Sequence, residues 1–374
     1  MSKQQLRIAS FGFRSIPPSK GSAGADKFAV EFLPRLAERG YEVVGYNRIY
    51  PGQTKGPDDY KGVRVYYFKT IPKSGIDSMI HSAKVTWHIL TRNTARIVHI
   101  QGNNALFAFI LKIFGKKVIL SIDGTEFERE KWSWFMRKLV LANAYLAVWS
   151  CKYIAIDNIF TKELFEKKFK KKFDFISFGS EIKETTDTDI LTKLGLEKGD
   201  YFLFVGRFIP DKGLQYLIPA FEKLKTGKKL VLVGGSPNPS EFELGLKNTS
   251  DPRIIFPGFI YGDDTVTLMK NAYCYIQPSD IEGLSPVMLS VMGLGTPLIC
   301  SNIKENMYLV HQDALTFEKS DVNDLTRQLE YSLEHRDEHL QLAAKAKERI
   351  SKEYSWETIT DQYVELFEKS LQKK

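Results

Sequence analysis

The chain has 374 residues, which is enough for two domains, and its 43% hydrophobic and 26% charged residues exclude a disordered or fibrous chain. Three cysteines, Cys151, Cys274 and Cys300, lie far apart without a Cys-x-x-Cys pair, so we expect reduced core thiols in a cytosolic protein. The net charge of +8 is uneven: residues 1–178 hold 30 Lys and Arg against 15 Asp and Glu, and the rest hold 23 against 30. The first half is expected to attract anions, and no nucleic-acid-binding motif accompanies its charge.

Strand-like and helix-like segments alternate along the first half of the chain. Strands are predicted at 7–11, 41–46, 63–68, 96–100, 117–122 and 152–156, and helices at 25–39, 77–92, 104–114 and 128–145. This β-then-α alternation predicts an α/β fold with a parallel sheet covered by helices on both faces.

A polar stretch at 176–200 interrupts the alternation and is predicted to link the first domain to a second one. Further strands are predicted at 201–206, 229–235, 253–259, 274–279 and 297–301, with helices at 212–225, 239–248, 264–271 and 286–294 and an almost wholly helical tail at 321–371. Two doubly wound halves of this kind predict a ligand cleft between them.

The first candidate motif runs from Gly206 to Gly213, where a predicted strand ends and a helix begins. This is the carboxyl edge of the sheet, where open α/β sheets bind ligands. Arg207 and Lys212 can both hold a diphosphate there and so do the work that a divalent cation does elsewhere. The alternative is a capped turn with two solvated cations.

The second candidate motif covers 278–286 and leads into the predicted helix at 286–294. Gly283 allows the backbone to approach a ligand, and the free N–H groups of the helix start form an anion site. Glu282 can accept hydrogen bonds from the hydroxyls of a sugar. The alternative is an acidic residue that complements the helix dipole.

Together, the two motifs resemble those of glycosyltransferase family 4, which carries Gly-Arg-…-Lys-Gly and, further on, Glu-Gly-…-Pro-Val-…-Glu-Ala-Met-…-Gly-Thr-Pro. The counterparts here are 206–213, 282–287, Met292 and 295–297, together with 256–260 at the base-binding turn, 354–357 before the final helix and the glycine-rich loop 20–24. Three segments, 12–17, 123–132 and 282–285, look most like bacterial enzymes that transfer rhamnose or related sugars in surface-polysaccharide assembly.

The resemblance implies the GT-B fold, with two Rossmann-like domains facing a central cleft. The N-terminal domain (1–178) would bind the acceptor, a saccharide or lipid-linked saccharide. The C-terminal domain (179–355) would bind the nucleotide-diphosphate sugar, and 356–374 would cross back as a helix. Such enzymes transfer with retention at the anomeric carbon and without metal, so no cofactor is expected beyond the nucleotide sugar as co-substrate.

The implied site has two sets of residues. Arg207, Lys212 and Glu282 are the expected catalytic groups, joined by Asp123, which follows strand 117–122 and either orients a hydroxyl, acts as a base or merely closes a turn. The donor-binding residues are expected to be Gly24, Gly206, Gly258, Phe259, Ile260, Gly283, Leu284, Ser285 and Ser290.

Ser290 departs from the family pattern, because it occupies the place of the family's second glutamate. In relatives that glutamate accepts hydrogen bonds from the ribose hydroxyls, whereas serine offers a single neutral hydroxyl. We therefore expect weak discrimination of ribose from deoxyribose, as with a dTDP-sugar donor. Two rival functions stay open: a non-catalytic nucleotide-sugar-binding subunit and a GT-B nucleotide-sugar epimerase.

Three further features are assigned structural or membrane roles. The Asp187-Thr188-Asp189 triplet is expected to cap a helix rather than bind metal, and His99 is expected to be a core histidine with its polar atoms paired. Five lysines around three phenylalanines at 165–173 suggest an anionic membrane surface as a partner, with a solvated helix end over core phenylalanines as the alternative. The expected location is cytoplasmic, peripheral on the inner face of the membrane.

Overall fold

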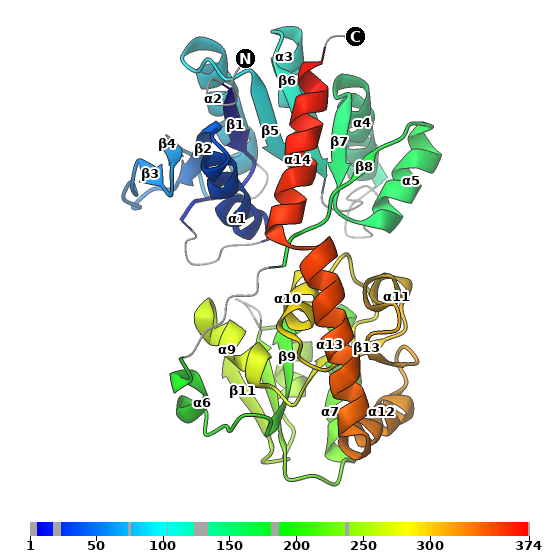
Figure 1. The fold of residues 1–374 in the computed structure, drawn as a ribbon. Helices are drawn as coiled ribbons and strands as arrows, with labels where there is room; N and C mark the ends of the chain where they lie inside the picture. The colour runs from blue at the N-terminus through cyan, green and yellow to red at the C-terminus, as the bar shows by residue number, and fades with distance from the viewer. Residues whose placement is uncertain are drawn as a thin grey trace. The chain divides into compact units, whose positions relative to one another are not determined.

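The computed structural model describes residues 6–17, 24–73, 76–102, 104–122, 134–180, 187–235 and 239–372. The chain forms two compact units. Unit 1 consists of Met1–Gly179 with Trp356–Lys374, and unit 2 consists of Ser180–Ser355. Both are α/β layers built on parallel sheets (Figure 1).

The described residues of unit 1 form an eight-stranded sheet in the order β3-β4-β2-β1-β5-β6-β7-β8. Its strands are β1 (Arg7–Phe11), β2 (Glu42–Ile49), β3 (Asp59–Tyr60), β4 (Val63–Lys69), β5 (Ile97–Gln101), β6 (Lys117–Ile122), β7 (Tyr153–Ile156) and β8 (Asp174–Phe175). Among the described strands of this sheet, only the short edge strand β3 runs antiparallel to its neighbour. The central strands are continuous apolar runs because helices cover both of their faces.

Helices cover the two faces of this sheet in separate groups, as Figure 1 shows. One face carries α2 (Ile76–Thr91), α3 (Ala105–Ile113), α4 (Trp134–Ser150) and α5 (Ile159–Phe169). The other carries α1 (Gly24–Glu38) and α14 (Trp356–Leu371), so the end of the chain completes the core of the unit that its beginning forms.

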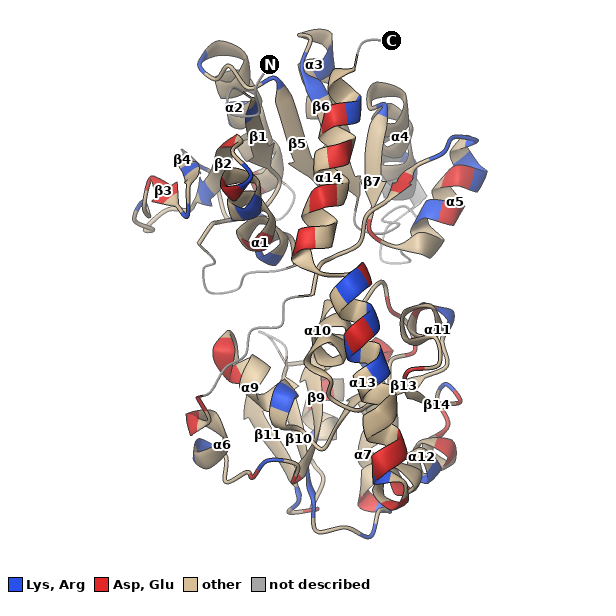
Figure 2. Ribbon diagram, in the orientation of Figure 1, with Lys and Arg blue, Asp and Glu red and all other residues tan. Residues whose placement is uncertain are grey.

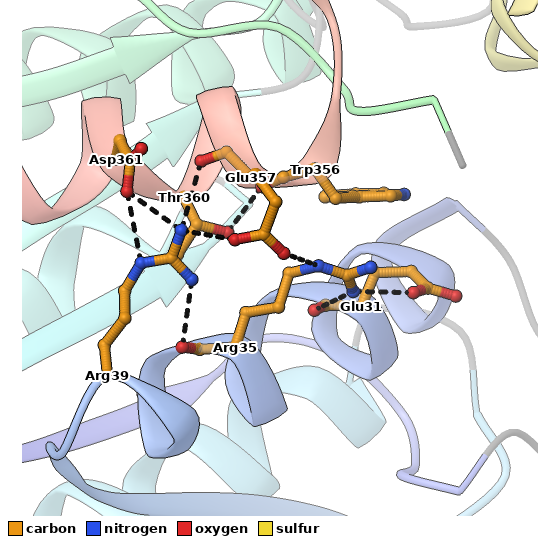
Figure 3. A network of polar contacts seen from close by, with 7 residues as sticks. All are labelled: Glu31, Arg35, Arg39, Trp356, Glu357, Thr360 and Asp361. Atoms are coloured by element: carbon orange, nitrogen blue, oxygen red, sulfur yellow. Dashed lines mark hydrogen bonds and ion pairs between the residues drawn. The ribbon is translucent and has the colours of Figure 1, made fainter. Parts of the chain in front are cut away.

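The attachment of α14 combines apolar packing with the charged contacts that Figure 3 shows. The Trp356 ring is almost fully buried and packs edge-on against Phe28, 5.6 Å between ring centroids. Arg39 donates to Glu357 (2.6 Å) and to Asp361 (2.9 Å), while Arg35 donates to Glu357 at 3.0 Å. Burial of the aromatic rings stabilises the packing of α14 on unit 1. The charged contacts set the position of α14 along its own axis.

Unit 2 contains a six-stranded parallel sheet in the order β11-β10-β9-β12-β13-β14 among its described residues. Its strands are β9 (Tyr201–Gly206), β10 (Lys229–Gly234), β11 (Ile254–Gly258), β12 (Cys274–Gln277), β13 (Leu298–Ser301) and β14 (Leu315–Phe317). Its α-helices are α6 (Asp189–Lys193), α7 (Leu214–Glu222), α8 (Glu241–Leu246), α9 (Asp263–Asn271), α10 (Pro286–Leu294), α11 (Lys304–Val310), α12 (Val322–Glu334) and α13 (Arg336–Glu353). Because every strand runs the same way, all carboxyl ends meet at one edge.

The structure corrects several of the expected element boundaries. The helix expected at 212–225 begins only at Leu214, after a 3-10 turn, Pro210–Lys212, because Gly213 has a left-handed φ of +74°. The stretch 176–200 is not a uniform linker, since it contains α6, whose Ile190 is buried in unit 2. The short edge strand β14 was not predicted from the sequence. Among the described residues, no helix is both long and apolar enough to cross a membrane.

Candidate functional site in the second unit

The strand order of unit 2 reverses between β9 and β12. From β9 the sheet grows through β10 to β11 on one side, and from β12 through β13 to β14 on the other. In open α/β sheets, ligands bind outside the carboxyl ends of the strands at such a reversal. The loops that leave β9 and β12 there are the two candidate motifs.

Close backbone contact joins these two loops. A Cβ atom on Gly213 would lie 1.9 Å from the carbonyl oxygen of Pro278, and the left-handed φ of Gly213 also disfavours any other residue. Nearby, the Asp280 amide donates to the Asp211 carbonyl at 2.9 Å. The glycine therefore allows the loop after β9 to lie directly on the loop after β12.

The contact between the loops brings Lys212 to Glu282. The lysine Nζ donates to the glutamate Oε1 at 2.5 Å, with the Glu282 side chain only 8% exposed. The same oxygen accepts from Ser279 Oγ at 2.7 Å and from Gln277 Nε2. Three donors on Oε1 fix the carboxylate, while Oε2 receives no hydrogen bond from the described residues and is left to accept from a ligand.

The Gln277 side chain is oriented by a hydrogen bond from a buried tyrosine. The Tyr275 hydroxyl donates to Gln277 Oε1 at 2.9 Å, which turns the amide nitrogen toward Glu282. Burial raises the pKa of the Tyr275 phenol, so this donor keeps its proton at any physiological pH. Gln277, Ser279 and Tyr275 were not predicted from the sequence as supporting residues. One signal was present: Gln277 is a polar residue at the end of a buried strand.

Arg207 follows Gly206 at the end of β9. Its side chain is exposed, and within the described part of the chain it makes no hydrogen bond or ion pair. A Cβ atom on Gly206 would lie 2.8 Å from the Phe204 ring, so glycine is required for packing at this strand end. An unpartnered guanidinium at the strand reversal is free to bind an anion in two-point fashion.

The N-terminus of α10 lies after the Glu282 loop and is well formed. Ser285 is the N-cap, and its Oγ accepts from the Met288 amide at 3.3 Å. Pro286 follows at the first helical position, where its missing N–H costs nothing. Gly283 is exposed and Leu284 half-buried in the same loop, so the backbone there is open to a ligand.

Ser290 lies one helical turn further along α10. Its hydroxyl donates to the Pro286 carbonyl of the same helix at 2.9 Å. The proton of this hydroxyl is therefore engaged within the helix, and only its lone pairs remain for a ligand.

The expected base-binding turn lies at the end of β11. Gly258 has a φ of +80°, and the next residue, Phe259, is 47% exposed. The Phe259 ring lies parallel to that of Tyr261, 6.0 Å between centroids and 2° between planes. The Ile260 carbonyl accepts a hydrogen bond from the Thr265 hydroxyl at 2.8 Å. The two exposed rings form an aromatic platform at the same sheet edge as Arg207 and Glu282.

Two expected site residues belong to unit 1. Gly24 is the exposed first residue of α1, and a Cβ atom there would meet nothing nearer than Phe178 at 3.8 Å, so local packing does not require glycine. Asp123 lies outside the described residues, as does the glycine-rich loop before Gly24.

Unit 1 has a small pocket at the carboxyl edge of its own sheet. Its lining includes Gln101, Ser121, Asp157, Ser177 and Tyr363. Gln101 is 7% exposed, and its side-chain Oε1 has no hydrogen-bond partner in the described structure. The exposed lining of this pocket is mainly apolar, and the pocket lies at the edge that corresponds to the candidate-site edge of unit 2.

His99 fulfils the expectation of a core histidine. Its Nδ1 is 2.9 Å from Ser10 Oγ and its Nε2 is 2.8 Å from Ser121 Oγ. Burial lowers the pKa of His99 to about 3, so the ring is neutral and both nitrogens are paired. This histidine holds the sheet together and is not an acid or base for chemistry near pH 7.

The Asp187-Thr188-Asp189 triplet and the lysine-rich segment also have structural roles. The Asp187 carboxylate accepts from the Asp189 amide at the start of α6, as expected of a helix start. Phe165 and Phe173 are buried in the core, and Lys171 donates to the carbonyls of Val148 and Cys151 at the end of α4. The segment 165–173 is therefore no amphipathic membrane helix, because its aromatic side chains face inward.

Residues 187–349 match the family model described as Glycosyl transferases group 1. O-antigen chain mannosyltransferase B of Escherichia coli is 26% identical over 184 residues, which are 48% of each chain. The chain thus spans about half the length of this relative, and it spans 63% of a glycosyltransferase of Methanocaldococcus jannaschii.

Solved structures resemble the whole chain. Sucrose-phosphate synthase from Thermosynechococcus elongatus has a TM-score of 0.82 at 18% identity, covering 98% of this chain and 99% of that one. Anabaena HepE, solved with UDP and glucose, has a TM-score of 0.78 at 16% identity, covering 97% and 100%. The chain has the GT-B fold of these proteins, and the matches together support a transferase of the glycosyltransferase class.

Proposed function

We propose that this protein is a retaining glycosyltransferase of surface-polysaccharide assembly. It moves a sugar from a nucleotide-diphosphate donor to a saccharide or lipid-linked saccharide acceptor. The observation that carries the proposal is the Lys212–Glu282 pair at the strand reversal of unit 2, whose free carboxylate oxygen can accept from a sugar, with the unpartnered Arg207 in the same loop as Lys212. A likeness to O-antigen enzymes among the relatives supports the polysaccharide context.

The chemistry assigned to these residues is stabilisation of the leaving diphosphate. Lys212 Nζ spends one of its three N–H donors on Glu282 and has two left for phosphate oxygens. Arg207 supplies a planar pair of donors, and the N–H groups of the first turn of α10 add partial positive charge. As the bond from the anomeric carbon to the phosphate breaks, negative charge grows on the leaving diphosphate, and these donors are proposed to stabilise it.

The sugar of the donor is proposed to be held by Glu282. Because Oε1 is fixed by three donors, Oε2 is the atom that receives the sugar hydroxyls, and no rearrangement of the loop is needed. With retention, the front-face reaction has the leaving phosphate oxygen take the proton of the acceptor, so no protein nucleophile is needed. Asp123 is proposed to orient a hydroxyl.

The identity of the transferred sugar rests on the segments 12–17 and 123–132, which favour rhamnose or another deoxysugar. The first test is a thermal-shift panel of UDP-, GDP-, ADP- and dTDP-sugars that includes dTDP-rhamnose and GDP-mannose. We expect at least one to raise the melting temperature and then to be turned over with a saccharide acceptor, giving a product with the donor's anomeric configuration.

The same assay separates the alternatives. A shift without transfer to any acceptor would indicate a binding subunit, and release of free sugar without an acceptor would indicate an epimerase. Turnover is expected to persist in EDTA, since Arg207 and Lys212 are proposed to replace a metal. Inhibition by EDTA that magnesium or manganese reverses would contradict the metal-free proposal.

We also propose peripheral association with an anionic membrane, where a lipid-linked acceptor would lie. The support is the excess of 30 basic over 15 acidic residues in 1–178.

A further inference from the structure

The C-terminal ends of α2, α3 and α4 carry large apolar side chains that no part of the described structure covers. Trp87 lies one turn before the end of α2 and is 71% exposed. At the end of α3, Ile113 is 63% exposed and Phe114 is 65% exposed. Near the end of α4, Trp149 is 69% exposed. Single exposed apolar residues are ordinary, but four at neighbouring helix ends indicate an interaction site.

The three helices lie side by side, so these residues share one edge of unit 1. Ser82 of α2 donates to the Asn104 side chain at the start of α3 (3.2 Å). The rings of Phe109 on α3 and Trp149 on α4 lie 5.4 Å apart. Because each helix runs opposite to the parallel strands, their C-terminal ends lie at the amino edge of the sheet, away from its carboxyl edge. We call this surface the amino-edge patch. It consists of Trp87, Ile113, Phe114 and Trp149 with the lysines Lys112, Lys117 and Lys152.

The stretch of sequence that forms most of the patch carries basic residues and no acidic ones. Between Asp77 and Asp123 there is no acidic residue, while Lys84, Arg92, Arg96, Lys112, Lys116 and Lys117 all occur there. Lys152 is exposed just after α4. Figure 2 shows basic residues at the end of α3 and red turns along α14, on the opposite face of the sheet.

Helix capping explains part of this charge. The ammonium groups of Lys112 and Lys171 donate to carbonyls at the end of α4, and cations are favoured at helix C-termini. Capping does not explain the exposed rings. Lys112 also lies over the Trp149 ring, 5.4 Å from its centroid, which holds a cation and an apolar surface together.

We propose that the amino-edge patch docks unit 1 on an anionic lipid surface. The aromatic and aliphatic side chains would enter the interface between headgroups and acyl chains, where tryptophan is favoured, and the lysines would pair with lipid phosphates. The charge complementarity selects an anionic bilayer over a neutral one. The amino-edge patch is a different surface from the segment 165–173, and its binding to lipid does not depend on the sugar-transfer chemistry.

Vesicle cosedimentation tests the patch on the full chain. Wild type should bind phosphatidylglycerol–phosphatidylcholine vesicles at low salt and release them as salt rises. Changing Trp87→Gln and Phe114→Gln together should lower partitioning by roughly tenfold or more, since two large apolar groups lose their burial in lipid. Changing Lys117→Gln and Lys152→Gln should lower partitioning onto the vesicles by about fivefold per lysine.

Matched control variants keep the test specific. Leu244→Gln with Leu340→Gln removes two exposed apolar side chains of unit 2, and Lys193→Gln with Lys225→Gln removes two exposed lysines there. Both controls should bind vesicles like wild type. All variants change exposed side chains, so equal melting temperatures would confirm that folding is intact.

Several outcomes would overturn the proposal. These are equal binding of wild type to pure phosphatidylcholine vesicles, patch variants that bind like wild type, or gel filtration showing that the patch variants convert a dimer to a monomer, which would assign the surface to a second copy. Nucleotide-sugar binding is measured separately by thermal shift. Its failure would contradict the proposed transferase while the vesicle result stands, and the reverse also holds.

Discussion

Six parallel strands of unit 1 and the six strands of unit 2 share one order, yet the strand reversals of the two sheets carry different chemistry. In unit 1 the reversal lies between β1 and β5, and the polar side chains on β1, β5 and β6 that meet behind it are neutral: His99 with Ser10 and Ser121, which is hydrogen-bonded to Tyr363. In unit 2 the reversal between β9 and β12 carries the charged pair Lys212–Glu282. The parallel sheet therefore provides the place for a site, and the residues that follow the strands decide what the place can bind.

The largest effect is expected when a charged residue at the strand reversal of unit 2 is removed. Lys212→Ala or Arg207→Ala should lower turnover by roughly a hundredfold or more, the usual loss for one preorganised donor to a developing anion. Initial rates with a saturating donor measure it, and Lys223→Ala, an exposed lysine at the end of α7, is the matched control. Losses below tenfold in both site variants would assign the diphosphate to other groups.

The neutral His99 network of unit 1 predicts that acid lowers the stability of this unit. The pKa of His99 is about 3 in the folded state against about 6.5 unfolded, so the unfolded state binds the extra proton. Stability is therefore fully present above pH 6.5 and falls as pH drops toward 3, by about 2 kcal/mol between pH 7 and pH 5. His99→Gln should remove this contribution and leave that of His81, whose pKa burial also lowers to about 3.

Tryptophan fluorescence measures the effect in unit 1 alone, because all five tryptophans of the chain lie in that unit. Urea midpoints at pH 5, 6 and 7 would be compared for wild type and His99→Gln. If the variant keeps the wild-type dependence on pH, another group sets the acid sensitivity, and the neutral network is not its cause.

The smallest expected effect concerns the ribose of the donor. A carboxylate at position 290 would accept from both ribose hydroxyls, whereas Ser290 already donates its proton to Pro286. Titration calorimetry with UDP and dTDP should therefore show dTDP bound at least as tightly as UDP. Ser290→Glu should shift the preference toward UDP, and a wild-type preference for UDP of tenfold, about 1.4 kcal/mol, would refute the argument.

The fold was predictable because its signals are local and repeated. Apolar runs at 7–11 and 201–206 between amphipathic stretches specify parallel strands, and Pro286 marks the start of α10 to the residue. Short elements were missed for the same reason: β14 has three residues, too few for a period to show.

The candidate site was predictable in its charged residues and not in their supports. Lys212 and Glu282 stand out beside glycines in loops, and the structure brings them together. Their contact depends on the close approach of Gly213 to Pro278, and the anchoring of Glu282 depends on Gln277 and Tyr275. These are tertiary relations between strands that neighbour in space, and a single sequence carries no record of such distances.

Helix α14 has a consequence for the order in which the molecule can be made. Trp356 and Tyr363 belong to the core of unit 1, although the residues of unit 2 are translated before them. A nascent chain on the ribosome therefore carries an unfinished first unit, with one face of its sheet partly bare, until the last helix emerges. Unit 2 is continuous in sequence and has no such wait, so the second unit to be translated can be the first to reach its native state.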